Sequence, residues 1–200
     1  MPPKIVSALI DRAGTLFSLA ETIEITAEAN PNSAEMAKMT SFRHAGINRL
    51  SLGIQSLEPE GLNFLGRAHS DDEAFYALEL ACKLFNRVST DLIYGLPNQS
   101  AKNWENQLNR IFNFGITHLS AYQLTIEPGT IFHNRSRSGA VLTAEPDDIA
   151  DLYELTEEIT ASAGLPAYEV SNYASSDAQS LHNLTYWKSG DWIAVGPGAH

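Results

Sequence analysis

The sequence predicts an α/β fold built from parallel strands. Four short apolar or alternating runs have the length of β-strands, at residues 23–29, 48–55, 88–94 and 117–124. A stretch with helical periodicity follows each of them. Strands that alternate with helices in this way are parallel and are joined by right-handed crossovers. We therefore expect either a doubly wound sheet or part of a (β/α) barrel.

Residues with known capping and stopping preferences mark the predicted helices. The first helix begins near Ser33 and ends at Gly46, because glycine commonly follows the last turn of a helix. The second begins at Ser70, and Glu73 completes a capping box three residues later. The third begins at Ser100, a favourable N-cap residue. The second helix carries an apolar stripe at helical spacing, made of Phe75, Leu78, Cys82 and Phe85.

A fourth helix is predicted after a loop at residues 136–146. Pro146 suits the first helical position, and two aspartates follow in the first turn, where the helix dipole favours carboxylates. We place a domain boundary in this loop. Residues 1–138 then form the repeating strand–helix part, and residues 139–200 form the final helix and the start of a C-terminal region.

The charge and the cysteine content exclude several kinds of partner and site. Acidic residues outnumber basic ones 24 to 13, which gives a formal net charge of −11. Nucleic acids and anionic headgroups repel such a protein, so we expect no nucleic-acid partner and membrane contact only through partner proteins. The single cysteine, Cys82, excludes an intrachain disulfide and favours a reducing, cytoplasmic location. We expect neither a signal peptide nor a membrane span.

Each predicted strand has one apolar face and one small or polar face. A parallel strand that is buried on both sides is apolar throughout, so this pattern needs another explanation. With the apolar faces packed under the helices, the polar faces would line an interior that holds a ligand. In chain order, the polar-face residues are Thr26, Glu28, Ser51, Gly53, Gln55, Ser89, Asp91, His118, Ser120 and Tyr122.

Three of these residues lie near the C-terminal ends of their strands, where (β/α) barrels build their active sites. They are Glu28, Gln55 and Asp91. Each has a simpler explanation, namely capping the turn that follows, but the repetition over three strands favours a site. Arg67, in the loop after the second strand, has a guanidinium that can bind a carboxylate or phosphate. The alternative interpretation is that Arg67 is a solvated loop residue that binds no ligand.

Seven segments follow one another in the order of a known family. They are EITAEANP, GINRLSLGIQSL, LGRAHS, STDLIYGLP, LSAYQLTIEPGT, YEVSNYA and HNLTYW, between about residue 23 and residue 200. This order resembles the radical S-adenosylmethionine family around oxygen-independent coproporphyrinogen III oxidase. Within that family the resemblance is closest to the HemW branch, described as haem chaperones.

The resemblance implies a partial (β/α)6 barrel of TIM-like form. S-adenosylmethionine would lie across the strand ends and bind one iron of a 4Fe-4S cluster. This chain would supply strands three to six and the start of the C-terminal region, with the first two βα units missing. Carried over by position, the S-adenosylmethionine contacts are Glu28, Gln55, Arg67 and Asp91, with Thr125 a weaker match. Arg67 suits the carboxylate of the ligand, and the other groups stay unassigned.

The segment HNLTYW resembles the HNxxYW motif of the HemW branch, which is associated there with haem binding. The imidazole of His182 is a good axial ligand for haem iron. On a helix, Tyr186 would share the face of His182, and Trp187 follows it. The alternative is that the polar pair ties down a turn while the two aromatic residues join the core. The resemblance favours haem contact and delivery of haem to haemoproteins of the respiratory chain.

The chain departs from the family in two motifs. It contains neither CxxxCxxC nor GGGTP, and we expect Cys82 to be a small buried hydrophobe within a helix. Without three thiolates we expect no cluster and no radical activity. The chain then resembles an internal piece of a longer protein or the product of a truncated gene. The glycine-rich residues 195–200 would be a strand end that closes the cofactor pocket.

Two other functions stay open at this stage. The related oxidase, which decarboxylates two propionates of coproporphyrinogen III, is the first alternative, and the HNxxYW motif disfavours it. The second is an unrelated (β/α) hydrolase with Glu28 and Asp91 as acid and base. No nucleophile or metal-cluster motif in the sequence supports the hydrolase.

Overall fold

The computed structural model describes residues 1–196, except for the side chains of residues 33 and 34. The expected closing strand at residues 195–200 therefore lies mostly outside the described residues.

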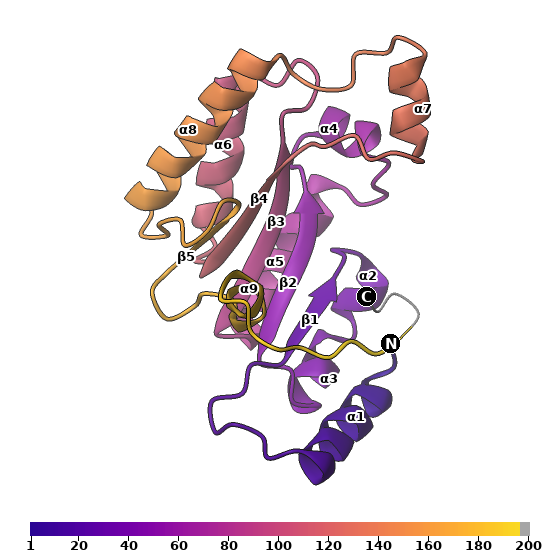
Figure 1. Cartoon of the computed structure of the whole chain (residues 1–200), viewed down its shortest axis with the longest axis vertical. Helices are drawn as coiled ribbons and strands as arrows, with labels where there is room; N and C mark the ends of the chain where they lie inside the picture. Colours follow the sequence, from indigo (N-terminus) through magenta and orange to yellow (C-terminus); the bar gives the residue numbers. More distant parts are fainter. Residues whose placement is uncertain (197–200) are drawn as a thin grey trace.

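A curved, open sheet forms the centre of the molecule (Figure 1). Four neighbouring strands are parallel and follow one another in chain order, as the sequence predicts. A fifth, which sequence reasoning missed, pairs antiparallel with the fourth. The strands are β1 (Thr26–Ala29), β2 (Arg49–Gln55), β3 (Arg87–Tyr94), β4 (His118–Gln123) and β5 (Asn172–Ala174).

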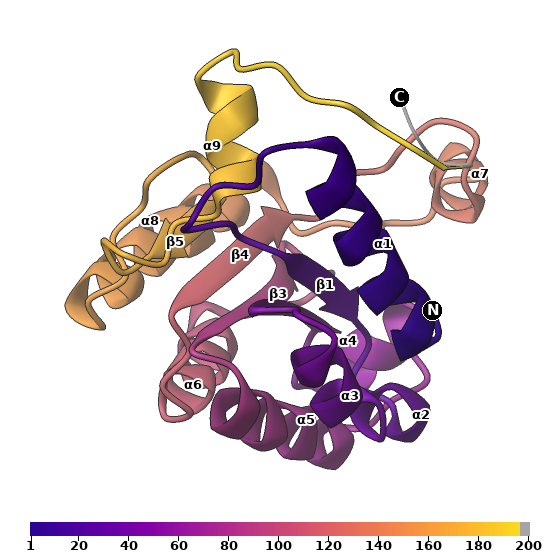
Figure 2. The ribbon, with the colours of Figure 1, turned by 90° about the horizontal axis from the view of Figure 1, so that it is seen from below.

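Helices cover the outer face of this sheet (Figure 2). There α3, α5 and α6 lie along the convex side, α1 lies beside β1 at one edge, and α9 lies on the opposite side near β5. Within the described chain, none of the helices is both long and apolar enough to cross a membrane. The helices are α1 (Pro3–Leu16), α2 (Ser33–Met36), α3 (Met39–His44), α4 (Pro59–Phe64), α5 (Asp71–Leu84), α6 (Ala101–Phe112), α7 (Ile131–Arg137), α8 (Pro146–Ser162) and α9 (Leu181–Trp187).

The predicted helix starts agree with the structure at three positions. Ser70 accepts a hydrogen bond from the backbone of Glu73 and completes the capping box of α5. Ser100 caps α6 by accepting from the backbone of Asn103, and α8 begins at Pro146. The first predicted helix differs, because the structure divides it into α2 and α3. The domain boundary at residue 138 stays a prediction.

The hydrophobic core lies between the outer face of the sheet and α5, α6 and α8. Trp104 of α6 is fully buried, and its indole nitrogen donates to Thr156 of α8 over 2.7 Å. This contact holds α8 against α6, so residues on either side of the predicted boundary share one core. The side chains buried there include Leu50, Leu52, Ile54, Ala77, Leu78, Leu92, Leu108, Ile111, Leu119 and Leu152.

Candidate functional site

A cavity of about 850 Å³ lies on the inner face of the sheet. Its walls are the inner faces of β1 to β4, residues 20–24 ahead of β1, and the first half of α9. This arrangement confirms the predicted two-faced strands, because their apolar residues belong to the core on the other side. The predicted polar-face residues that line the cavity are Thr26, Glu28, Ser51, Ser89, Asp91, His118, Ser120 and Tyr122.

Two carboxylates give part of the cavity wall a negative charge. Asp91 on β3 accepts a hydrogen bond from Ser51 on β2 over 3.1 Å. On the other side of β2, Glu28 on β1 pairs in register with Ser51. The pKa of Asp91 is raised to about 6, chiefly by burial and to a smaller extent by the charge of Glu28. Neither carboxylate forms an ion pair with any residue that the structure describes. The wall can therefore accept hydrogen bonds from a cationic or hydroxyl-bearing ligand.

A β-bulge lies at the end of β2, where Gln55 is the last residue of the strand. The register between β2 and β3 shifts between Gly53 and Gln55, and Gln55 has a φ of 69°. Its amide nitrogen would lie only 2.7 Å from a Cβ added at Gly53. Because Gly53 pairs with Asp91, the Gln55 amide lies above the glycine and next to the Asp91 strand. A side chain at Gly53 would require this amide, the end of a flexible side chain, to shift.

The other two predicted contacts lie apart from this cavity. Arg67 and Thr125 are not among the described residues that line it. Arg67 follows α4, and His69 two residues later holds this loop to the end of β2 through a 3.0 Å contact with the carbonyl of Ile54. Thr125 is exposed and donates only to the carbonyl of Gln123. The structure thus places Glu28 and Asp91 on the cavity wall, whereas Gln55, at the end of β2, is not among the described residues that line it. The S-adenosylmethionine assignment stays a prediction.

Helix α9 carries the three residues predicted to contact haem. His182 lines the cavity, and its ring meets the ring of Tyr186 edge-on at a centroid distance of 4.9 Å. On the other side of Tyr186, Trp192 is 5.5 Å away, an aromatic neighbour that sequence reasoning missed. Trp187 is 59% exposed and is not among the described residues that line the cavity.

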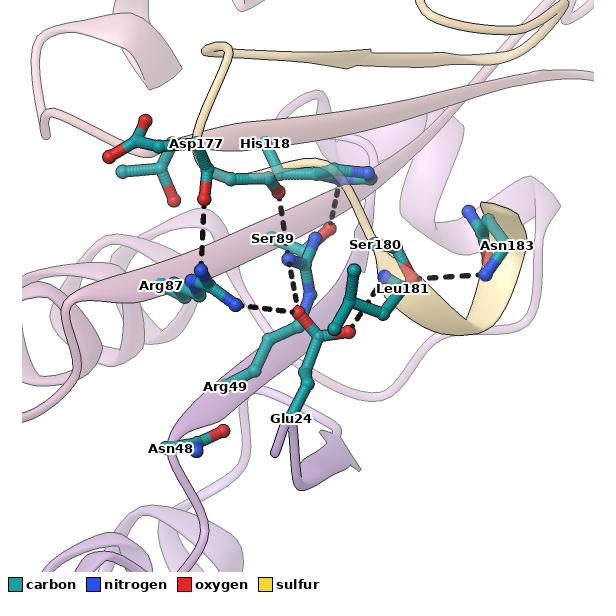
Figure 3. A network of polar contacts seen from close by, with 12 residues as sticks. Glu24, Asn48, Arg49, Arg87, Ser89, His118, Asp177, Ser180, Leu181 and Asn183 are labelled. Carbon is teal, nitrogen blue, oxygen red and sulfur yellow. Dashed lines mark hydrogen bonds and ion pairs between the residues drawn. The ribbon is translucent and has the colours of Figure 1, made fainter. Parts of the chain in front are cut away.

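A buried charge network closes the base of the cavity (Figure 3). The carboxylate of Glu24 is 4% exposed and pairs with Arg49 at 3.3 Å and Arg87 at 3.1 Å. Both arginines lie at the starts of their strands. Burial lowers the pKa of Arg49, and the charge of Glu24 opposes this effect. Sequence reasoning missed this network, although a charged residue at the start of two successive strands is a usable signal.

Near this network, His118 connects β3 and β4 to Tyr168. Its Nδ1 lies 2.6 Å from the hydroxyl of Ser89, and its Nε2 lies 2.7 Å from the hydroxyl of Tyr168. Burial lowers the pKa of His118 to about 3, and Arg49 adds to the effect. The imidazole is therefore neutral at physiological pH.

The protonation of His118 excludes a serine nucleophile at this point. The Tyr168 hydroxyl accepts from the side-chain amide of Asn183 at 3.1 Å and from the backbone of Ser180 at 3.4 Å. Its own proton therefore goes to Nε2 of His118, which leaves the ring proton on Nδ1. Nδ1 then donates to Ser89 and cannot take its proton, as a general base would have to.

The structure offers no cluster of thiolates. Cys82 lies part-buried in α5, and burial raises the pKa of its thiol. Among the described residues, no group of three histidine, cysteine or acidic side chains is arranged to hold a metal ion. A 4Fe-4S cluster does not fit the residues of this chain, because the 200 residues contain one cysteine.

Comparison with known proteins decides the family. Residues 3–111, more than half of the chain, match the Radical SAM superfamily. The chain belongs to this superfamily. A mouse protein named Radical S-adenosyl methionine domain-containing protein 1, mitochondrial, is 41% identical over 99% of this chain and 45% of its own length. The protein named Heme chaperone HemW of Escherichia coli (strain K12) is 41% identical over 98% of this chain and 51% of its own length.

A solved radical SAM structure confirms the fold. Coproporphyrinogen III oxidase of Escherichia coli matches with a TM-score of 0.76 and 22% identity, over 98% of this chain and 44% of that one. The predicted partial barrel of TIM-like form is thus confirmed. The chain spans about half the length of the curated relatives it matches.

Proposed function

We propose that this radical SAM protein binds haem through His182 and serves as a haem chaperone of the HemW kind. The observation that carries the proposal is the place of His182, which lies on α9 at the wall of the cavity. Its ring has an aromatic neighbour, Tyr186, on the same helix face. An imidazole beside an aromatic ring is suited to a flat macrocycle with a metal at its centre. The relatives named Heme chaperone HemW support this assignment.

The cavity also fits part of S-adenosylmethionine. The carboxylates of Glu28 and Asp91, which line the cavity, suit its ammonium and ribose hydroxyls, and the Gln55 amide lies against Gly53, the partner of Asp91 in the sheet. We propose these three residues as its contacts, with Arg67 and Thr125 retained as weaker candidates. When bound, the ligand supplies an adenosyl group on a sulfonium centre, whose positive charge the cavity wall favours.

Haem titration of the full chain tests the proposal. We expect hemin to give a Soret band typical of histidine ligation, and His182→Ala to abolish it. His44→Ala is the matched control, because His44 is an exposed histidine on α3, away from the cavity wall. Binding that is unchanged in His182→Ala, or lost equally in both variants, would contradict the assignment of His182.

Delivery of haem is tested by transfer. Loaded protein should pass haem to a respiratory apo-haemoprotein, and unloaded protein should not change that acceptor. Conversion of coproporphyrinogen by a longer form that carries the cluster motif would instead support the oxidase.

A cytoplasmic location is also part of the proposal. It rests on the single cysteine, whereas the mouse relative is named as mitochondrial. Fractionation of cells that express the protein distinguishes the two compartments.

A further inference from the structure

The first anchor of helix α9 is the buried carboxylate of Glu24. One oxygen accepts a hydrogen bond from the backbone of Leu181 at 3.0 Å, at the first residue of the helix. The other oxygen accepts from Arg49 and Arg87 (Figure 3). A single carboxylate thus joins α9 to the starts of β2 and β3.

The second anchor is the hydroxyl of Tyr168. It accepts from Asn183 on α9 and donates to His118 on β4, as derived above. His118 is 2% exposed and is held from its other side by Ser89. The hydroxyl therefore connects the exposed helix to a fixed group in the sheet.

Two further hydrogen bonds fix the turn that leads into α9. Arg49 donates to the carbonyl of Ala178 at 2.8 Å, and Arg87 donates to the carbonyl of Asp177 at 3.0 Å. Both arginines also bind Glu24. The backbone before the helix and the first turn of the helix are thus attached to the same charge network.

The two polar residues of the HNxxYW motif have different surroundings. Asn183 bonds to Tyr168, whereas the ring of His182 has no hydrogen-bond partner among the described residues and faces the cavity. We propose that Glu24, Tyr168 and Asn183 are positioning residues, which hold α9 so that His182 is presented to a flat metal chelate. The identity of that ligand rests on the function proposed above, but the anchoring of α9 does not.

The length of α9 explains why such anchors are needed. The helix has seven residues, and helices this short do not form in isolation because nucleation is costly. Packing contributes little stabilisation to α9, since the helix has no fully buried residue. The orientation of His182 therefore depends on the hydrogen bonds at the base of the helix. Loosening them lowers the fraction of molecules that are ready to bind and raises the apparent Kd in proportion.

Tyr168→Phe in the full chain tests the inference, because it removes only the hydroxyl. We expect about tenfold weaker hemin binding and an absorption spectrum that departs from histidine ligation. Without hemin, we expect backbone amides of residues 181–187 to exchange about tenfold faster with solvent. Asn183→Ala, which keeps the His118–Tyr168 contact, should act in the same direction and secures the test if Tyr168→Phe folds poorly.

Thr117→Val is the matched control for general destabilisation. Thr117 accepts a hydrogen bond from the backbone of Val88 at the same end of the sheet and is not among the described residues that line the cavity. Hemin binding and α9 exchange should match the wild type in this variant. Equal weakening in Tyr168→Phe and Thr117→Val, or no effect in Tyr168→Phe and Asn183→Ala, would overturn the inference. If wild-type protein binds no hemin, the proposed function fails, and faster exchange in Tyr168→Phe still supports the anchors.

Discussion

Asp91 is a buried carboxylate whose ionised form costs stability. Its pKa rises from 3.8 to about 6 on folding, chiefly because burial disfavours the charged form. A raised pKa means that the folded state holds the proton more tightly than the unfolded state. The stability gained from that proton is complete below about pH 4 and is lost as the pH rises through 6. At neutral pH the ionised carboxylate therefore opposes folding.

Asp91→Asn should stabilise the protein at neutral pH. We expect the free energy of unfolding to increase by about 2 kcal/mol at pH 7, and the difference to vanish near pH 4, where Asp91 is protonated. Urea unfolding at the two pH values measures both. A stabilisation that is equal at pH 4 and pH 7 would show that burial of the charge is not the cause.

The residues of the cavity were predictable where pattern alone determines them. The alternation of strand residues placed Glu28 and Asp91 on one wall because side chains of a strand point to alternate faces. The partners of Glu24 were not predictable, because that residue precedes its strand and contacts positions far along the chain. The place of Arg67 was not predictable either, since a loop residue has no register that fixes its direction; it is not among the described residues that line the cavity, and its role stays a prediction.

Among the elements, helix α8 packs apolar residues into the core and also makes a buried hydrogen bond with α6. Thr156 accepts from the indole of Trp104 and donates to the carbonyl of Leu152 in its own helix. All of these groups are buried. Without the threonine hydroxyl, the indole nitrogen would be left with no acceptor in the core.

Thr156→Val should therefore destabilise the protein by about 2 kcal/mol. Thr160→Val is a matched comparison, because Thr160 is equally buried on α8 and its hydroxyl bonds only to its own helix. We expect it to cost less than half as much in thermal or urea unfolding. Equal losses would mean that the contact between α6 and α8 contributes nothing of its own.

The elements that sequence reasoning found are those with strong periodicity or clear caps. The four parallel strands and helices α5, α6 and α8 agree with the structure. Strand β5 was missed because three residues are too few for a pattern. Helix α1 was missed because its apolar positions remain largely exposed, with no buried residue.

For the whole molecule, two buried groups oppose each other in the response to acid. The pKa of His118 falls from 6.5 to about 3 on folding, because burial disfavours the charged imidazole. Stability from His118 is therefore complete above pH 6.5 and is lost as the pH falls towards 3. The contribution of Asp91 to stability increases as the pH falls from 6 to 4, because its pKa is raised on folding. We expect the two contributions to cancel in that interval, which leaves a nearly flat profile.

His118→Asn should remove the contribution of His118 to the pH dependence of stability and leave that of Asp91. With Asp91 alone titrating, we expect the free energy of unfolding to increase by about 2 kcal/mol between pH 6 and pH 4. Denaturant unfolding at intervals of half a pH unit measures the slope. A wild-type profile that falls steeply between pH 6 and pH 4 would contradict the cancellation.

The hydrogen bond between Glu24 and Leu181 joins positions that are 157 residues apart. Because a nascent chain leaves the ribosome with its N-terminus first, β1 to β4 can assemble long before α9 is translated. During that interval one oxygen of Glu24 can already accept hydrogen bonds from Arg49 and Arg87, while the other oxygen is still exposed to water. The wall of the cavity that α9 forms is thus added after the walls that β1 to β4 form.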